Sequence, residues 1–410
     1  MKRALIIIVV LLFTGMTIFA QDVDMSFYVE EYNRTGTSVF DLLDVLVAVR
    51  GENLTGIGDF YHNAIVVFLQ RLPNFNTSQE LVAVHEVSRL ILRGLGAEKH
   101  TASAPYVWTL VEYYDVSQQQ NDGFLMHEAL VTMGLIGAVE YAPHIVTKMD
   151  YFDAHETPDI QIRRKLQLGL TGAVSALEAL HEPIGVRPVF FASIGWYDPD
   201  IRSIASAAFP NIMEDPYEIV IDIIKNPFNG PSVKLAAWRA MLRTRAPNIS
   251  KAKVAVTTIE MSYTYIAANR DGQNILREMR ISAIDYFRVI KEIPDESIYA
   301  YLERAYRDGF YTNNTDTEIM MVVVRTLSAV ATDEAVDLLT SFLRELHTRR
   351  RTGPWGVTER QLMQYIIPSI AVTGTQSRLA IQLLSTIQSS SMYTGAEQSW
   401  ARNALRALTR

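Results

Sequence analysis

The sequence predicts an all-α protein, an α-solenoid of stacked two-helix repeats with an N-terminal helical cap. Apolar residues recur at spacings of three and four along most of the chain, which is the period of a helix with one buried face. Short turns that contain Gly, Asp, Glu or Pro separate these segments into pairs, and matching central positions such as Val87 and Ala129 lie 42 residues apart. Such units cannot bury their apolar faces alone, so they must stack.

The composition excludes several classes of protein. The chain has 410 residues, of which 49% are hydrophobic, and it contains no cysteine. A chain this apolar folds instead of remaining disordered. Without cysteine it has neither disulfides nor thiol chemistry. Its formal net charge of -7 argues against a general nucleic-acid-binding protein.

Residues 1–20 are predicted to be a signal peptide. Lys2 and Arg3 supply a positive start, residues 4–13 form an apolar run, and Ala20 ends a plausible cleavage site. This pattern favours a periplasmic or secreted protein with no membrane span after signal cleavage. The alternative is an uncleaved anchor, because residues 4–20 could cross a bilayer if the helix tilted or the bilayer thinned.

Residues 21–77 are predicted to form the N-terminal helical cap, and residues 78–410 the repeat array. Within the cap, residues 38–50 and 59–72 show helical spacing, for example at Phe40, Leu43 and Val47. The helix pairs expected after the first repeat helix are residues 125–149, 163–189, 201–224, 233–261, 276–306, 318–346 and 359–387, with a final lone helix at 398–408.

The clearest repeat places Ala129 and Met133 on one stripe, breaks at Gly137 and resumes at Ala142. This pattern resembles the HEAT repeats, particularly the short type found in phycobilisome lyases. Weaker copies begin at Ile201-Arg202 and at Met279-Arg280, and the resemblance covers about four fifths of the chain. It implies an α-solenoid that works by binding. Tetratricopeptide repeats are a rival architecture, but their required aromatic and small residues at a constant spacing of about 34 are missing.

Histidine precedes glutamate more often than chance predicts. Four of the eight histidines do so, whereas the 45 acidic residues in the chain would give about one such pair. The pairs are His85-Glu86, His127-Glu128, His155-Glu156 and His181-Glu182. The first two share a register in consecutive repeats, so stacked helices could bring them to a shared site.

Imidazole and carboxylate ligands together suit iron, manganese or zinc. The sequence therefore raises His85, Glu86, His127 and Glu128 as a candidate metal site. The arrangement resembles deoxyhypusine hydroxylase, a HEAT-like enzyme whose His-Glu pairs hold two irons, although the other two pairs are out of register. The simpler interpretation is that these residues are ordinary polar positions on helix surfaces, with no cofactor.

Catalytic motifs are absent from the sequence. It has no G-x-S-x-G elbow, no H-E-x-x-H helix and no phosphate-binding loop, so whether the protein is an enzyme is left open, with a non-enzymatic role favoured. Candidate binding features are the basic clusters at residues 163–165, 239–245 and 349–351, the Trp196-Tyr197 pair, and the loops near 196–201, 308–316 and 349–356. Such loops commonly gather along one edge of a repeat array.

These observations predict an exported helical-repeat scaffold that binds a protein partner in the cell envelope. Recognition would use the extended surface made by successive helices and their connecting loops. The alternative function is a metal-binding protein or metalloenzyme that uses the His-Glu pairs. The identity of the partner and the oligomeric state are beyond what the sequence predicts.

Overall fold

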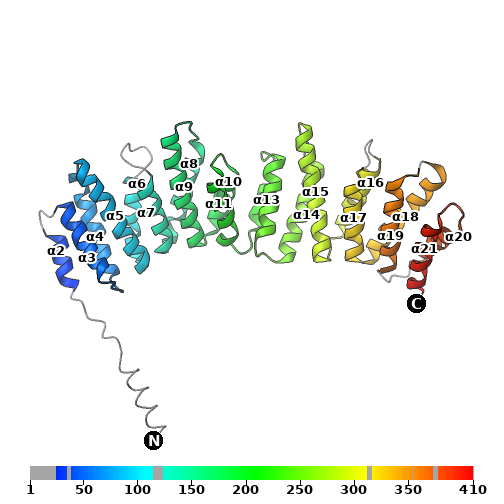
Figure 1. The fold of residues 1–410 in the computed structure, drawn as a ribbon, viewed down its shortest axis with the longest axis horizontal. Coiled ribbons are helices and arrows are strands. Elements are labelled where there is room, and N and C mark those ends of the chain that lie inside the picture. Colours follow the sequence, from blue (N-terminus) through cyan, green and yellow to red (C-terminus); the bar gives the residue numbers. More distant parts are fainter. Residues whose placement is uncertain are drawn as a thin grey trace, which may run out of the picture. The chain divides into compact units, whose positions relative to one another are not determined.

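The computed structural model describes residues 25–34, 38–113, 123–311, 316–353, 355–372 and 377–409. Every regular element within these ranges is an α-helix or a short 3-10 helix, so the predicted all-helical class is confirmed (Figure 1). The predicted signal peptide and residues 312–315 of one predicted loop lie outside the described ranges. None of the described helices is long and apolar enough to cross a membrane.

The contacts divide the chain into two compact units, residues 1–208 and 209–410. The helices up to that boundary are α2 (Met25–Asn33), α3 (Val39–Gly51), α4 (Gly58–Arg71), α5 (Ser78–Glu98), α6 (Ala104–Tyr113), α7 (Phe124–Leu135), α8 (Ala142–Ala154), α9 (Ile160–Leu180), α10 (Val186–Ile194) and α11 (Pro199–Ile212), whose last residues pass it. Short 3-10 helices lie at Leu72–Asn74, Thr101–Ser103, Val139–Tyr141 and Pro183–Gly185.

The second unit continues with the same alternation. Its helices are α12 (Tyr217–Lys225), α13 (Pro231–Arg243), α14 (Asn248–Thr264), α15 (Arg270–Ile290), α16 (Ser297–Tyr311), α17 (Thr317–Val330), α18 (Asp333–Thr352), α19 (Val357–Val372), α20 (Arg378–Ser389) and α21 (Gly395–Leu408). Each predicted helix pair coincides with two of the observed helices. The reason is that the apolar period and the turn residues, both local features of the chain, determine where a helix lies and where it ends.

Within each unit the helices form two layers. In the first unit, α3, α5, α7 and α9 pack side by side in order, α4, α6 and α8 lie against α5, α7 and α9, and α10 packs against α8. In the second unit, the odd-numbered helices from α13 to α21 form one layer and the even-numbered helices from α12 to α20 the other. Most of these helices are thus covered both by the partner in the pair and by the neighbouring repeat, as expected for units that stack.

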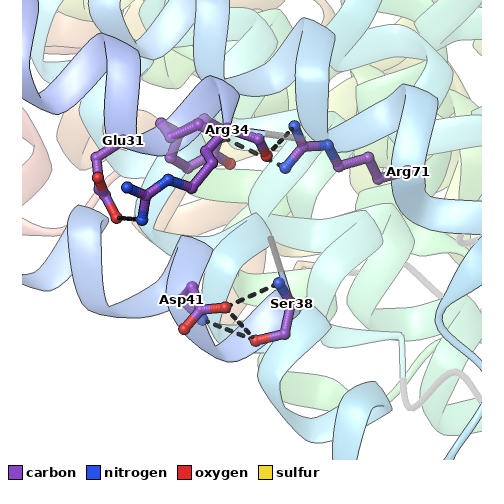
Figure 2. A network of polar contacts seen from close by, with 6 residues as sticks. Glu31, Arg34, Ser38, Asp41 and Arg71 are labelled. Atoms are coloured by element: carbon purple, nitrogen blue, oxygen red, sulfur yellow. Dashed lines mark hydrogen bonds and ion pairs between the residues drawn. The ribbon is translucent and has the colours of Figure 1, made fainter. Parts of the chain in front are cut away.

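Several helices begin with side-chain caps that the sequence encodes locally. Ser38 accepts a hydrogen bond from the backbone N–H of Asp41 at 3.2 Å, and the Asp41 carboxylate accepts one from the backbone N–H of Ser38 at 2.9 Å (Figure 2). The same reciprocal capping box occurs with Thr77 at the start of α5 and with Thr394 at the start of α21. These caps satisfy backbone N–H groups that have no partner within the helix.

The short helix α2 is attached through Arg71, the last residue of α4. The Arg71 guanidinium donates to the carbonyl oxygens of Asn33 at 3.0 Å and Arg34 at 3.1 Å, and more weakly to that of Tyr32 at 3.4 Å (Figure 2). Carbonyls at the end of a helix lack partners within the helix and carry partial negative charge, so a cation stabilises them. The Arg71 side chain therefore adds polar contacts to the packing of α2 against α3 and α4.

Helix α3 buries a different stripe from the one that the sequence indicated. Val39, Leu42 and Leu46 are almost completely buried, whereas Phe40 is 45% exposed and Val47 is 54% exposed. The helix is apolar nearly all round, so its period alone could not decide which face meets the neighbours. Packing against α2 and α5 selects the buried face.

Glycine allows α7 and α9 to approach closely. A Cβ atom added to Gly134 would lie 2.8 Å from the Cα atom of Ala176, and one added to Gly172 would lie 2.8 Å from the carbonyl oxygen of His127. Both distances are shorter than a van der Waals contact, and both involve backbone atoms that cannot move aside cheaply. Glycine at these two positions therefore permits the close packing of α7 on α9.

We expect Gly134→Val to lower the free energy of unfolding by about 1–3 kcal/mol, because the new side chain must push α9 away from α7. Urea unfolding followed by circular dichroism measures this change. Gly51→Ala is the matched control, since a Cβ atom at Gly51 meets nothing within 4 Å and should leave the midpoint nearly unchanged. Equal midpoints for both variants would contradict the close-packing account.

Candidate functional site

The two residues of the second His-Glu pair face different neighbours. On α7, His127 Nδ1 lies 3.2 Å from the carbonyl oxygen of Leu168 on α9, and the Glu128 carboxylate accepts a hydrogen bond from Arg93 on α5 at 2.8 Å. Consecutive residues on a helix are about 100° apart, which explains why the two side chains diverge. His127 and Glu128 therefore do not converge on one site.

The other residues of the predicted metal site also have local partners. Glu86 forms an ion pair with Arg89 on the same helix, and His85 lies half-buried one residue before it. Across the described ranges, no three His, Asp or Glu side chains come close enough together to hold a metal ion. His155 follows the end of α8, and His181 ends α9 with a positive φ of 55°, so both lie out of register with the first two pairs.

In the first two predicted basic clusters, arginines form ion pairs within the fold. Arg163 donates to the Asp198 carboxylate at 2.7 Å and lies over the Trp196 ring at 5.6 Å. Arg239 on α13 forms an ion pair with Glu278 on α15. These contacts join neighbouring repeats, which accounts for those two arginines structurally.

The third cluster borders a cleft between α16 and α18. This cleft has a volume of about 570 Å³. Its lining combines arginines, hydroxyl groups, one carboxylate and one aromatic ring: Arg307, Phe310, Ser341, Arg344, Glu345, Thr348, Arg349, Thr352 and Gly353. Three guanidinium groups and a single carboxylate give the lining a positive balance. We take this arginine-lined cleft as the candidate functional site.

The three arginines differ in how strongly the protein already engages them. Arg307 pairs with Glu303 on its own helix at 2.6 Å, and Arg349 lies 3.5 Å from the Glu359 carboxylate. Arg344 is exposed and has no ion pair or side-chain hydrogen bond with any described residue. Because an exposed ion pair contributes little free energy, an incoming carboxylate could compete with Glu303 for Arg307, and it would meet no competitor at Arg344. The pair of Arg349 with Glu359 is more buried.

Aromatic packing makes the floor of the cleft rigid. The Arg349 guanidinium carbon lies 4.3 Å from the centroid of the Phe310 ring. Below it, Tyr306 stacks on Phe342 with ring centroids 3.7 Å apart and on Phe310 at 5.8 Å. A cation over an aromatic face keeps its donors directed outward while its flat face is covered. The cleft therefore presents an apolar surface beside ordered cationic groups.

The position of the cluster on α18 also favours its charge. Asp333 and Glu334 occupy the first turn of α18, and Arg349, Arg350 and Arg351 occupy its last turn. The negative end of the helix dipole stabilises cations there. Arg350 additionally donates to the Met392 carbonyl at 2.9 Å and lies over the Trp355 ring at 4.5 Å. The cluster thus has a structural role at the helix end, and Arg349 extends it into the cleft.

His347 on α18 makes the region beside the cleft sensitive to pH. Burial, followed by the charge of Arg351, lowers the pKa of His347 below its usual value. Its Nδ1 atom lies 2.6 Å from the Tyr393 hydroxyl, a contact in which a neutral imidazole nitrogen can accept. The folded protein therefore favours the neutral ring.

In the unfolded chain the pKa of His347 should be about 6.5, and in the folded protein it is lower. We therefore expect the neutral ring to contribute fully to stability above about pH 6.5. This contribution should be lost as the pH falls toward the pKa of the folded protein. Urea unfolding at pH 7.5 and pH 5 should show a larger loss of stability for the wild type than for His347→Phe, which cannot ionise. An identical loss in both proteins would show that His347 does not contribute.

Neither a scan against protein-family models nor a search of curated proteins finds a match to this chain. The function must therefore be argued from the residues and their geometry.

Sequence reasoning identified one side of the cleft and missed the other. The triple arginine was found because its charges are consecutive, whereas Arg307 and Phe310 belong to a different repeat. A usable signal was present on α18, where Ser341, Arg344 and Thr348 recur at spacings of three and four on a polar face. The predicted binding loop at residues 308–316 includes Phe310, but the structure places residues 308–311 at the end of α16, which supplies the opposite wall through Arg307 and Phe310.

Proposed function

We propose that this protein is an exported scaffold of HEAT-type helical repeats that binds a protein partner in the cell envelope. In this proposal the arginine-lined cleft binds an acidic segment of the partner that also carries an apolar side chain. The observation that carries the proposal is the cleft itself, where three arginines surround an aromatic floor and Arg344 has no partner of its own among the described residues.

The composition of the cleft supports a protein partner. Arginine and aromatic residues are enriched at the points of protein interfaces that contribute most to affinity. The Ser341 hydroxyl can exchange hydrogen bonds with a peptide backbone. The Thr348 and Thr352 hydroxyls already donate to backbone carbonyls of α18 and can accept from a peptide N–H. A carboxylate can bind an arginine through two parallel hydrogen bonds, which would orient the acidic segment along α18.

Two further parts of the proposal rest on the sequence. Export is supported by the charged start and apolar run of residues 1–20. The HEAT assignment is supported by the repeat pattern from residue 126 to residue 146, and by the pairing of α7 and α8 over that segment. Stacked pairs of this kind expose long surfaces that are suited to binding.

We expect Arg344→Glu to reduce partner capture about tenfold, since reversing an exposed charge beside a bound carboxylate costs on the order of 1–2 kcal/mol. The measurement is quantitative crosslinking in the native envelope, with a photoreactive side chain introduced at Thr348. Arg402→Glu on α21 is the matched control, because Arg402 is also an exposed arginine of the second unit and lies outside the cleft.

Capture should weaken as salt rises, because exposed charges are screened. If Arg344→Glu and Arg402→Glu capture the same partner as efficiently as the wild type does, the cleft is not the binding site. If the crosslinks at Thr348 identify no protein, the scaffold proposal fails for this surface.

The export proposal has a separate test. We expect intact-mass measurement of the protein purified from its native envelope to give a chain that begins near Gln21, because cleavage after Ala20 fits the small-residue rule. A mass that includes residues 1–20 in a membrane fraction would favour the retained anchor. A full-length chain in the soluble cytoplasm would contradict export.

A further inference from the structure

A second pocket lies within the first unit, between α8 and α10. It has a volume of about 370 Å³, and most of its wall is aliphatic or aromatic, including Met149, Leu170 and Phe191. This pocket is lined entirely by residues 146–197, so it is separate from the arginine-lined cleft and from the function proposed for that cleft. Its lining has more acidic than basic side chains, whereas the lining of the cleft has more basic than acidic ones.

Two carboxylates, Asp150 and Asp153, line this pocket from successive turns of α8. Neither forms an ion pair with a described residue, and both remain accessible to solvent. Burial by the surrounding pocket raises the pKa of Asp153, and the like charge of Asp150 adds to this effect. The protein therefore places two carboxylates that lack an ion-pair partner among the described residues beside an apolar surface.

Tyr197 provides an independent sign that the pocket is built for a ligand. Its side chain lines the pocket and is only 2% exposed, yet its hydroxyl makes no hydrogen bond of ordinary length and angle with a described residue. The Asp153 carboxylate lies close enough to act on it: burial, and then the charge of Asp153 and a weak hydrogen bond to that carboxylate, raise the pKa of the phenol. Buried polar groups without partners are rare in folded proteins.

The loop that carries Tyr197 is firmly attached to the helices around the pocket. The Trp196 indole N–H donates to the backbone carbonyl of Asp153 at 3.2 Å, and the two aromatic rings of Trp196 and Tyr197 lie 4.4 Å apart. Arg163 on α9 fixes the next residue, Asp198, through its ion pair. The unsatisfied hydroxyl is therefore held in place by its surroundings.

Arg187 is the only cation in the pocket lining. Its guanidinium carbon lies 5.9 Å from the centroid of the Phe191 ring, and it forms no ion pair with either aspartate. One arginine against two carboxylates leaves the lining with a net negative charge. The pocket thus combines an apolar wall with hydrogen-bond acceptors that need a positively charged donor.

We propose that this pocket binds an organic cation with an apolar body, namely a primary ammonium or guanidinium group on a hydrocarbon chain or ring. The cationic group would donate to the carboxylates of Asp150 and Asp153 and to the Tyr197 hydroxyl oxygen. The hydrocarbon would pack against Met149, Leu170 and Phe191. A free amine and a lysine or arginine side chain of a peptide share this chemistry.

Isothermal titration calorimetry on the full chain tests the proposal with three probes. They are 4-phenylbutylamine, its neutral analogue 4-phenylbutan-1-ol, and the capped dipeptide N-acetyl-Phe-Lys-amide. We expect the amine or the dipeptide to bind at least about tenfold more tightly than the alcohol, because hydrogen bonds between charged groups are stronger than those of a neutral hydroxyl. Tighter binding of the amine identifies a free ligand, and tighter binding of the dipeptide identifies a peptide side chain.

Single substitutions locate the binding. We expect Asp153→Asn to weaken the cationic probe about tenfold and to leave the alcohol unchanged, because the substitution removes charge and keeps the shape of the side chain. Tyr197→Phe, which removes only the hydroxyl, should weaken the same probe by a smaller factor. Asp200→Asn is the matched control, since Asp200 is an exposed aspartate of the first unit that does not line the pocket.

Three results would overturn the assignment: no probe binds, the alcohol binds as tightly as both cations, or Asp153→Asn and Asp200→Asn have equal effects. The comparison of probes on the wild-type chain needs no variant, so it remains informative if a substitution disturbs folding. Failure of this test would leave the arginine-lined cleft and its partner unaffected.

Discussion

Lateral burial of each helix by its neighbours is the constraint on which the rest of this structure depends. Most of the helices are between 9 and 17 residues long, and isolated helices of that length are marginal in water. Their stability must come from apolar stripes that meet the stripes of the helices on either side. The close approach at Gly134 and Gly172 shows how tightly one such contact is made.

The same constraint determines where binding surfaces can arise. Side chains on the outer faces of the helices are free of core packing, so they can carry charge. In the first unit, the space between α8 and α10 is lined by two aspartates and a buried tyrosine. In the second unit, the space between α16 and α18 is lined by arginines over an aromatic floor. Both sites use neighbouring helices of the even-numbered layer, where adjacent repeats leave a gap.

Charged residues in this protein divide into those that join repeats and those that remain available. Two ion pairs link neighbouring repeats, namely Arg93 with Glu128 and Arg163 with Asp198. The partners in each pair lie 35 positions apart in the chain. Arg344, which lacks such a partner among the described residues, lies in the cleft that we propose for binding. A cluster of like charges in the sequence is therefore a poor guide until the partners of each member are known.

The sequence by itself determined the helical class, the order of the helix pairs and many of their caps, because these depend on short-range periodicity and on residues within one turn. It also indicated one wall of the cleft. Only the tertiary structure decided that α3 buries Val39 and Leu42 in place of Phe40, that His127 and Glu128 face different helices, and that Tyr197 meets Asp153. Those outcomes depend on which helices become neighbours and on their rotation, and both are set by packing between segments that lie tens of residues apart.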